Sequence, residues 1–308
     1  MNRSTRTNPM STSASESSAP CKIGLVAGWG RYPVVVATAL KQSGHHVCCM
    51  GIKDHADPAL RQIADTYGEF GLARMGAQIR FFKQHNVTKI TMAGKIDKIR
   101  LVGKLSWIKH VPDLTAMAAF YHHFFSFRRD RRDDTLLSTA VELAAKHNLE
   151  AIPATDFAPG LLVQAGRLAG PRLSQMQRRD IDFAWSIAKE IGRLDIGQTV
   201  AVNGQAALAI EAIEGTDECI RRAGKLCPSG GFTVVKVSKP QQDMRFDVPT
   251  IGMGTLQTLA EAGGRVLAIE AGKTIFIDHQ EAINFARRHR ISLVAIDRAE
   301  MSCLSDAA

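Results

Sequence analysis

The residues best suited to chemistry stand in one short stretch, Lys236–Pro249, with the sequence KVSKPQQDMRFDVP. Its cations can neutralise a diphosphate, and its carboxylates can hold a hard cation such as Mg²⁺ or orient a water molecule. A proline near each end limits backbone freedom. The side chains are Lys239, Gln241, Gln242, Asp243, Arg245 and Asp247. They predict a phosphate or metal site, with a salt-bridged structural turn as the alternative.

A second acidic group occupies Glu211–Arg222, EAIEGTDECIRR. It places Glu214, Thr216 and Asp217 at a predicted helix start, where capping alone explains Thr216 or Asp217. Capping does not explain the further carboxylates Glu211 and Glu214. Metal coordination shared with the first stretch would explain them.

A glycine turn, Gly24–Gly30 (GLVAGWG), joins a predicted strand to a predicted helix. Glycines there let backbone N–H groups approach a phosphate at the positive end of a helix. Gly28 and Gly30 fit the dinucleotide fingerprint, but Pro33 occupies its third position. A nicotinamide cofactor is therefore disfavoured. Nucleotide contact and a plain tight turn both remain open.

Strands and helices alternate in the first half of the chain, which predicts a parallel sheet with helices on both faces. The expected strands are 23–27, 46–51, 88–93 and 150–153, and the expected helices are 33 onward, 71–85, 113–127 and 134–147.

The second half predicts a distinct mixed α/β domain. A helix is expected over Ser174–Ile191, with Ser174 as N-cap and Gly192 as stop. Asn203-Gly204 predicts a hairpin turn. The polar segment 193–198 (RLDIGQ) either packs near the site or is only a helix end and a turn. The expected strands are 199–202, 206–210, 233–237, 266–269, 274–277 and 293–296.

The length of 308 residues is that of two domains. The expected division is a disordered Ser- and Thr-rich tail at 1–20, an N-terminal domain at 21–155, an inter-domain segment at 156–173 and a C-terminal domain at 174–308.

The net charge of +9 favours anionic partners or simply solubility. The six cysteines form no CxxC pair, so reduced thiols in a cytosolic protein are expected.

The stretch from Arg80 to Lys109 is basic, and residues 99–110 add apolar side chains and Trp107. This pattern suits an anionic membrane surface, although it more often belongs to a helix that packs on its own core with a solvated basic face. The basic residues match no nucleic-acid-binding module, so nucleic acid is not an expected partner.

Taken together, these segments resemble the UDP-2,3-diacylglucosamine pyrophosphatases of the LpxI type. The resemblance runs over residues 22–297, and EGTD and KPQQDMRFDVPTIG are its most specific parts. The motifs that carry it are AGWGRYP at 27–33, MAGK at 92–95, RDDTLL at 132–137, GRLDIGQ at 192–198, AIEAIEGTDECIRR at 209–222, KPQQDMRFDVPTIG at 239–252 and EAGKTIFID at 270–278.

The resemblance implies a Rossmann-like N-terminal domain and a C-terminal catalytic α/β domain with the acylated sugar between them. It also implies dependence on Mg²⁺ (or Mn²⁺), a homodimer, and a cytoplasmic enzyme at the inner-membrane surface. Water would attack the α-phosphorus of UDP-2,3-diacylglucosamine, releasing UMP and 2,3-diacylglucosamine 1-phosphate (lipid X).

The family's catalytic aspartate corresponds to Asp247, which would bind the metal or position the water. Around this aspartate, further metal ligands and substrate contacts are expected. The metal ligands would be Asp217, Glu214 and Asp243, and the substrate contacts would be Gly28, Gly30, Thr216, Lys239, Gln242 and Arg245. The alternative is a non-catalytic nucleotide-sugar or lipid-binding protein at the membrane surface.

Overall fold

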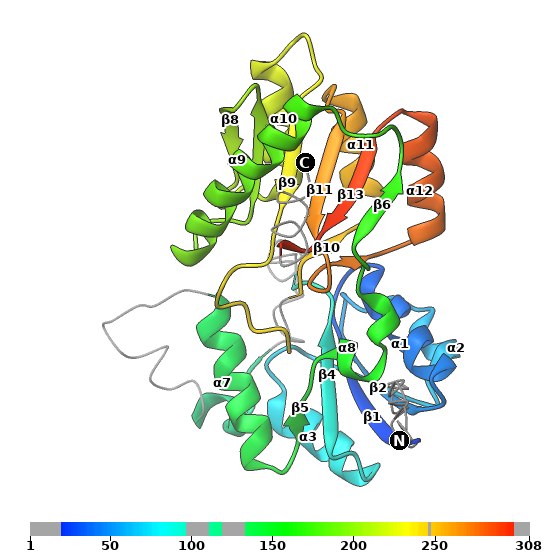
Figure 1. The fold of residues 1–308 in the computed structure, drawn as a ribbon. Coiled ribbons are helices and arrows are strands. Elements are labelled where there is room, and N and C mark those ends of the chain that lie inside the picture. Colours follow the sequence, from blue (N-terminus) through cyan, green and yellow to red (C-terminus); the bar gives the residue numbers. More distant parts are fainter. Residues whose placement is uncertain (1–19, 97–110, 119–132, 246–247, 299–308) are drawn as a thin grey trace, which may run out of the picture.

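The computed structural model describes residues 20–96, 111–118, 133–245 and 248–298. They form two α/β domains, each built on its own sheet (Figure 1). The N-terminal sheet is wholly parallel and the larger C-terminal sheet is mixed. The predicted fold class is therefore confirmed.

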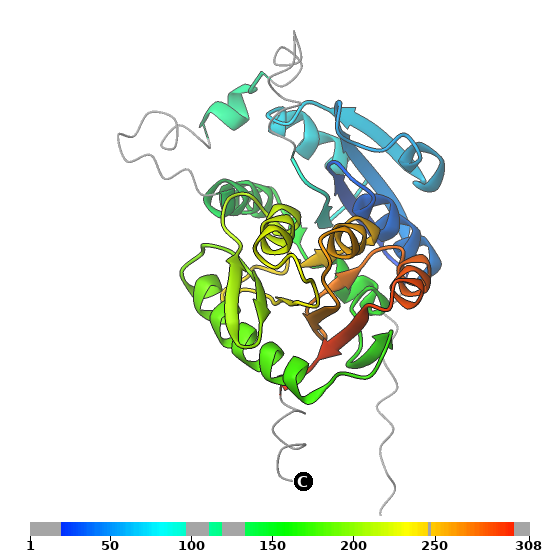
Figure 2. The ribbon, with the colours of Figure 1, turned by 90° about the horizontal axis from the view of Figure 1, so that it is seen from above.

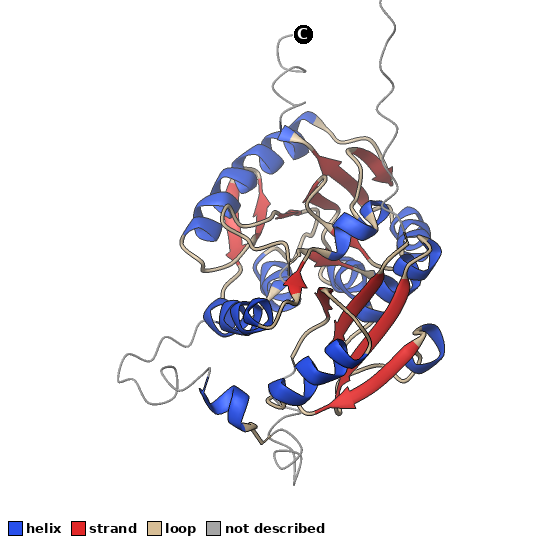
Figure 3. Ribbon diagram, turned by 90° about the horizontal axis from the view of Figure 1, so that it is seen from below, coloured by secondary structure: helices blue, strands red, loops and turns tan. Residues whose placement is uncertain are grey.

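The N-terminal sheet has the strand order β3-β2-β1-β4-β5, which is the order of Rossmann-like folds. Its apolar strands bury both faces: Cys49 lies in the core on one side and Cys48 in the core on the other. Helices α1, α2 and α8 cover the first face, and α3 and α7 the second (Figure 3). The strands are β1 (Lys22–Ala27), β2 (His46–Ile52), β3 (Thr66–Phe70), β4 (Lys89–Ala93) and β5 (Glu150–Ala151), and the helices are α1 (Tyr32–Gln42), α2 (Leu60–Ile63), α3 (Met75–Gln84), α7 (Asp133–Lys146) and α8 (Ala154–Phe157).

The C-terminal sheet has the order β6-β13-β11-β9-β7-β8, with β9, β11 and β13 parallel. Helix α9 covers one face, while α10, α11 and α12 cover the other (Figure 2). A small parallel pair, β10 with β12, lies beside it. The strands are β6 (Gly166–Ala169), β7 (Thr199–Asn203), β8 (Ala206–Ile210), β9 (Thr233–Lys236), β10 (Thr250–Ile251), β11 (Val266–Glu270), β12 (Ile275–Phe276) and β13 (Ser292–Ile296), and the helices are α9 (Gln175–Arg193), α10 (Thr216–Leu226), α11 (Met253–Glu261) and α12 (His279–Arg288).

Two details predicted within the C-terminal domain need correction, namely the end of its first helix and the position of a hairpin turn. Ser174 caps α9 in a capping box with Gln177, as expected, but Gly192 does not end the helix. The helix runs to Arg193, and Asp195 takes the left-handed conformation after it. In the β7–β8 hairpin the two turn residues with positive φ are Gly204 and Gln205, one position later than predicted.

The two domains meet at the carboxyl ends of the N-terminal strands. In Figure 1 β1 and β4 point up toward the C-terminal domain, and the segment after β9 runs down toward them. Arg31, just before α1, bonds to Asp278, just before α12, at 3.0 Å between Nη2 and Oδ1. Leu162 forms a bridge with Ile275 of β12. Ligands of open α/β sheets bind at such strand ends, so this is where a site is expected.

Some predictions fall outside the described residues. Residues 99–110, which suit a membrane surface, are among them, as are the tail at 1–19 and Cys303. The other five cysteines are free thiols. Among the described helices, none has the length and apolar character needed to cross a bilayer.

Candidate active site at the carboxyl ends of the C-terminal strands

The predicted polar stretch leaves β9 and is anchored at both ends. At its start, the Ser238 amide donates to Glu270 Oε2 of β11 at 2.8 Å. At its far end, the Ile275 amide of β12 donates to the Pro249 carbonyl at 2.8 Å, and β10 follows at once. The stretch is therefore tied at its start to β11 of the large sheet and at its end to β12 of the small one, and it leaves the large sheet at the carboxyl end of β9.

The first turn of this loop packs on the end of α9. Lys239 Nζ lies 2.6 Å from Asp195 Oδ1, and Gln241 Nε2 donates to the Arg193 carbonyl at 3.0 Å. Gln242 Oε1 accepts from the Lys239 amide at 2.8 Å. The segment 193–198 thus lies beside the loop, as one reading of the sequence proposed. Lys239 and Gln242, two predicted substrate contacts, are brought together here.

Asp243 and Arg245 form a tight pair within the loop. The guanidinium donates through Nε and Nη2 to the two carboxylate oxygens, at 2.5 to 3.0 Å. These bonds hold the pKa of Asp243 below its usual value and raise the pKa of Arg245. A salt-bridged turn, the structural alternative for this stretch, is therefore present. Asp247 lies outside the described residues, so its position is not given.

The start of α10 carries a buried polar network that reaches β9. Glu211, buried, accepts from the Gln198 amide at 3.2 Å and from Thr216 Oγ1 at 3.0 Å. Lys236, the last residue of β9 and also buried, donates to Thr216 Oγ1 at 3.0 Å and to the Thr250 carbonyl at 3.2 Å. Thr216 is thus bonded to an anion on one side and a cation on the other. Its helix is capped by Gly215 (φ 83°) rather than by Thr216 or Asp217.

The three described carboxylates that were predicted to hold Mg²⁺ each have a protein partner. Glu214 pairs with Arg222 at 2.6 Å, Asp217 accepts from Thr255 Oγ1 at 3.2 Å, and Asp243 binds Arg245. No group of three or more metal-ligating side chains is placed to hold an ion among the residues that the structure describes. The binding of a metal by these carboxylates together with Asp247 stays a prediction.

Backbone hydrogen bonds join the glycine turn of the N-terminal domain to the end of β4 and the residues after it. The Gly28 amide donates to the Ala93 carbonyl and the Trp29 amide to the Lys95 carbonyl, both at 2.8 Å. A Cβ on Gly28 would lie 2.8 Å from the Lys95 carbonyl oxygen, so this glycine permits the close approach of the chain after β4. Gly30 has a φ of 106° with open space around its Cα. The contact of Gly28 and Gly30 with a nucleotide stays a prediction.

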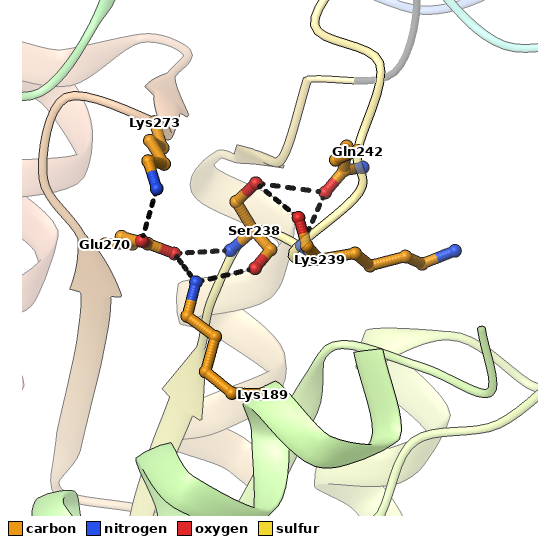
Figure 4. Close-up of polar contacts among 6 residues, drawn as sticks. All are labelled: Lys189, Ser238, Lys239, Gln242, Glu270 and Lys273. Atoms are coloured by element: carbon orange, nitrogen blue, oxygen red, sulfur yellow. Dashed lines mark hydrogen bonds and ion pairs between the residues drawn. The ribbon is translucent and has the colours of Figure 1, made fainter. Parts of the chain in front are cut away.

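Sequence reasoning missed two charged residues of the site and one partner. Lys236 and Glu270 each end a buried parallel strand, in TVVK and VLAIE. A charge at the end of an otherwise apolar strand was the available signal. Lys189, near the C-terminal end of α9, gave no such signal. Its Nζ reaches Glu270 Oε2 at 2.6 Å and the Ser238 carbonyl at 2.8 Å (Figure 4).

A cavity of about 640 Å³ lies away from these residues. It is formed by β6, the turn after it, the last turn of α12 and Arg290 beyond that helix, and three of its seven lining residues are arginines. None of the predicted site residues lines it. The lining residues are Arg167, Leu168, Ala169, Gly170, Pro171, Arg287 and Arg290.

Comparison with known proteins agrees with the two-domain architecture. Residues 22–161 match the family model of the LpxI N-terminal domain, and residues 164–294 match that of the LpxI C-terminal domain. A curated relative from Caulobacter vibrioides, named UDP-2,3-diacylglucosamine pyrophosphatase LpxI, is 29% identical over 291 residues. That alignment covers 91% of this chain and 99% of the relative.

Proposed function

Because this chain belongs to the LpxI family through both of its domains, we propose that it hydrolyses the pyrophosphate bond of UDP-2,3-diacylglucosamine in lipid A biosynthesis. Water attacks the α-phosphorus, and the products are UMP and 2,3-diacylglucosamine 1-phosphate. The observation that carries the proposal is the described part of the loop, residues 238–245, which brings Lys239, Asp243 and Arg245 to the carboxyl ends of β9 and β11.

The roles we propose follow from charge and position. Lys239 and Arg245 neutralise the diphosphate, and their positive charge stabilises the negative charge that develops on the phosphate oxygens. Asp247 positions the attacking water and takes its proton. Arg245 keeps Asp243 ionised, so Asp243 holds the guanidinium in place rather than accepting a proton. Thr216 and Gln242 are further contacts for the substrate.

Three further parts of the proposal rest on the family resemblance and on the sequence patterns described above. These are dependence on Mg²⁺ or Mn²⁺, assembly as a homodimer, and peripheral contact with the inner membrane from the cytoplasm. The contact of Glu214, Asp217 and Asp243 with a metal belongs with them. Assaying hydrolysis with Mg²⁺, with Mn²⁺ and with EDTA tests the first of these.

The test is UMP release from UDP-2,3-diacylglucosamine by the wild type and by Asp247→Ala. Removing a general base costs on the order of 100-fold or more, so release by the variant is expected to fall at least that far. Asp182→Ala, at an exposed position of α9, is the matched control and should keep full activity. Full activity of Asp247→Ala would remove Asp247 from its role. No release by the folded wild type would favour the non-catalytic binding protein.

A further inference from the structure

The Ser238 peptide groups are held on both sides by one ion pair. Glu270 Oε2 accepts from the Ser238 amide at 2.8 Å, and Lys189 Nζ donates to the Ser238 carbonyl at 2.8 Å. Lys189 Nζ also donates to the same Glu270 oxygen at 2.6 Å, which closes a ring of three groups (Figure 4). The ring joins α9, β11 and the residue at which the loop leaves the sheet.

The carboxylate at the centre of this ring is buried. The Glu270 side chain is 10% exposed and that of Lys189 is 26% exposed. Removing both charges from water has a cost that their attraction offsets only with good geometry and further hydrogen bonds. A neutral acceptor would satisfy the Ser238 amide at lower cost. A charged pair at this point is better explained by what it holds in place than by stability.

What the ring holds in place is the start of the proposed catalytic loop. Ser238 is followed at once by Lys239, whose amide is bonded to Gln242 Oε1. Ser238 Oγ also lies 3.4 Å from Gln242 Oε1. A displacement of Ser238 would therefore also move the turn formed by Lys239 and Gln242, which precedes Asp243 and Arg245.

We propose that Glu270, with Lys189 as its counter-charge, is a positioning residue that sets the loop from Lys239 to Arg245 for hydrolysis. The proposal rests on the function proposed above. Glu270 acts through the loop and does not touch the substrate. Because a misplacement of roughly 1 Å can cost on the order of 100-fold in rate, its loss should appear in kcat more than in KM.

The experiment compares Glu270→Ala, Glu270→Gln and Lys189→Met with wild type in UMP release and in amide hydrogen exchange of the peptide 236–245. Glu270→Ala is expected to lower kcat by about 100-fold and Lys189→Met and Glu270→Gln by about 10-fold, with KM within about threefold. Glutamine does less harm because its one oxygen can still accept from Ser238 and Lys189. Exchange in the peptide should rise in the same order, while peptides of β7 stay protected.

Lys273→Ala is the matched control. Lys273 bonds the other Glu270 oxygen at 3.2 Å and is 56% exposed, so its loss should leave kcat and exchange unchanged. A merely structural role would lower the melting temperature of Glu270→Ala but leave its kcat intact, which would overturn the proposal. So would a loss of kcat without faster exchange. If Glu270→Ala does not fold, Glu270→Gln and Lys189→Met decide.

Failure of the proposed function would look different from failure of this proposal. A wild type that releases no UMP overturns the function, and with it the catalytic meaning of the ring. The exchange measurement would still show whether Glu270 holds the loop. Activity in the wild type together with unchanged kcat in all three variants overturns the positioning role alone.

Discussion

The two domains use similar architectures but place their charges differently. Among the described residues, the buried acidic and basic side chains of the N-terminal domain are two histidines, His45 and His55. Burial lowers the pKa of His45, which favours its neutral form. The C-terminal domain buries three carboxylates and an amine, at Asp180, Glu211, Glu270 and Lys236.

The difference extends to the strand ends where each domain could meet a ligand. At the end of β1, the amides of Gly28 and Trp29 bond to the chain after β4, so backbone closes the turn. At the ends of β9 and β11, by contrast, side chains make the hydrogen bonds: Lys236 donates to Thr216, and Glu270 accepts from the Ser238 amide. Buried charges are expensive, and they gather where a protein needs them for function. This contrast supports placing the proposed chemistry in the C-terminal domain.

The largest expected loss of stability comes from removing the buried Glu211 carboxylate, which bonds the first residue of α10. Glu211→Ala leaves the half-buried Gln198 amide and the Thr216 hydroxyl without the acceptor that Glu211 provides, at about 1–3 kcal/mol for each unsatisfied group. We expect the free energy of unfolding to fall by about 3 kcal/mol in urea titrations. The control is Glu218→Ala in the first turn of α10. The exposed ion pair of Glu218 with Arg221 should contribute less than about 1 kcal/mol. Equal effects would contradict the importance of buried charge in this domain.

A smaller loss is expected where backbone closes the N-terminal turn. Gly94 has a φ of 95°, and a Cβ there would lie 2.9 Å from the Gly28 carbonyl carbon and 2.8 Å from Pro33 Cγ. Gly94→Ala should cost about 2 kcal/mol from strain and crowding together. Gly44→Ala, with a φ of 82° and open space, isolates the strain at about 1 kcal/mol. A Gly94→Ala variant as stable as Gly44→Ala would show that the turn is not tightly packed.

Most elements of the fold could be predicted because their patterns are local. The buried runs of β1, β2, β9 and β11 and the capping signal of α9 lie within a few residues of each other in the chain. Strand β3 was missed because its five residues, TYGEF, are all half-buried and form no apolar run. Strand β6 was missed because it lies in a Gly- and Pro-containing stretch and is fixed by pairing with β13, far along the sequence.

The site was less predictable because its contacts cross long stretches of chain. The loop residues Lys239, Asp243 and Arg245 could be picked out by their density in one segment. The ion pair of Lys189 with Glu270 joins residues 81 positions apart, and no local sequence pattern indicates it. The predicted metal ligands show a further limit of sequence reasoning, and their contact with a metal stays a prediction. Glu214 and Asp243 look available in the sequence but are paired with Arg222 and Arg245 in the structure.

The smallest expected effect has the opposite sign and contrasts two buried threonines. Thr91 of β4 is fully buried, and its hydroxyl has no hydrogen-bond partner. Thr91→Val removes that unsatisfied group and keeps the side-chain shape, so the N-terminal domain should gain about 1 kcal/mol in urea unfolding. Thr199 of β7 is equally buried, but its hydroxyl lies 3.3 Å from Thr216 Oγ1. Thr199→Val should therefore destabilise the protein by about 1 kcal/mol. The same sign for both variants would mean that the polar network of the C-terminal domain contributes nothing that the N-terminal core lacks.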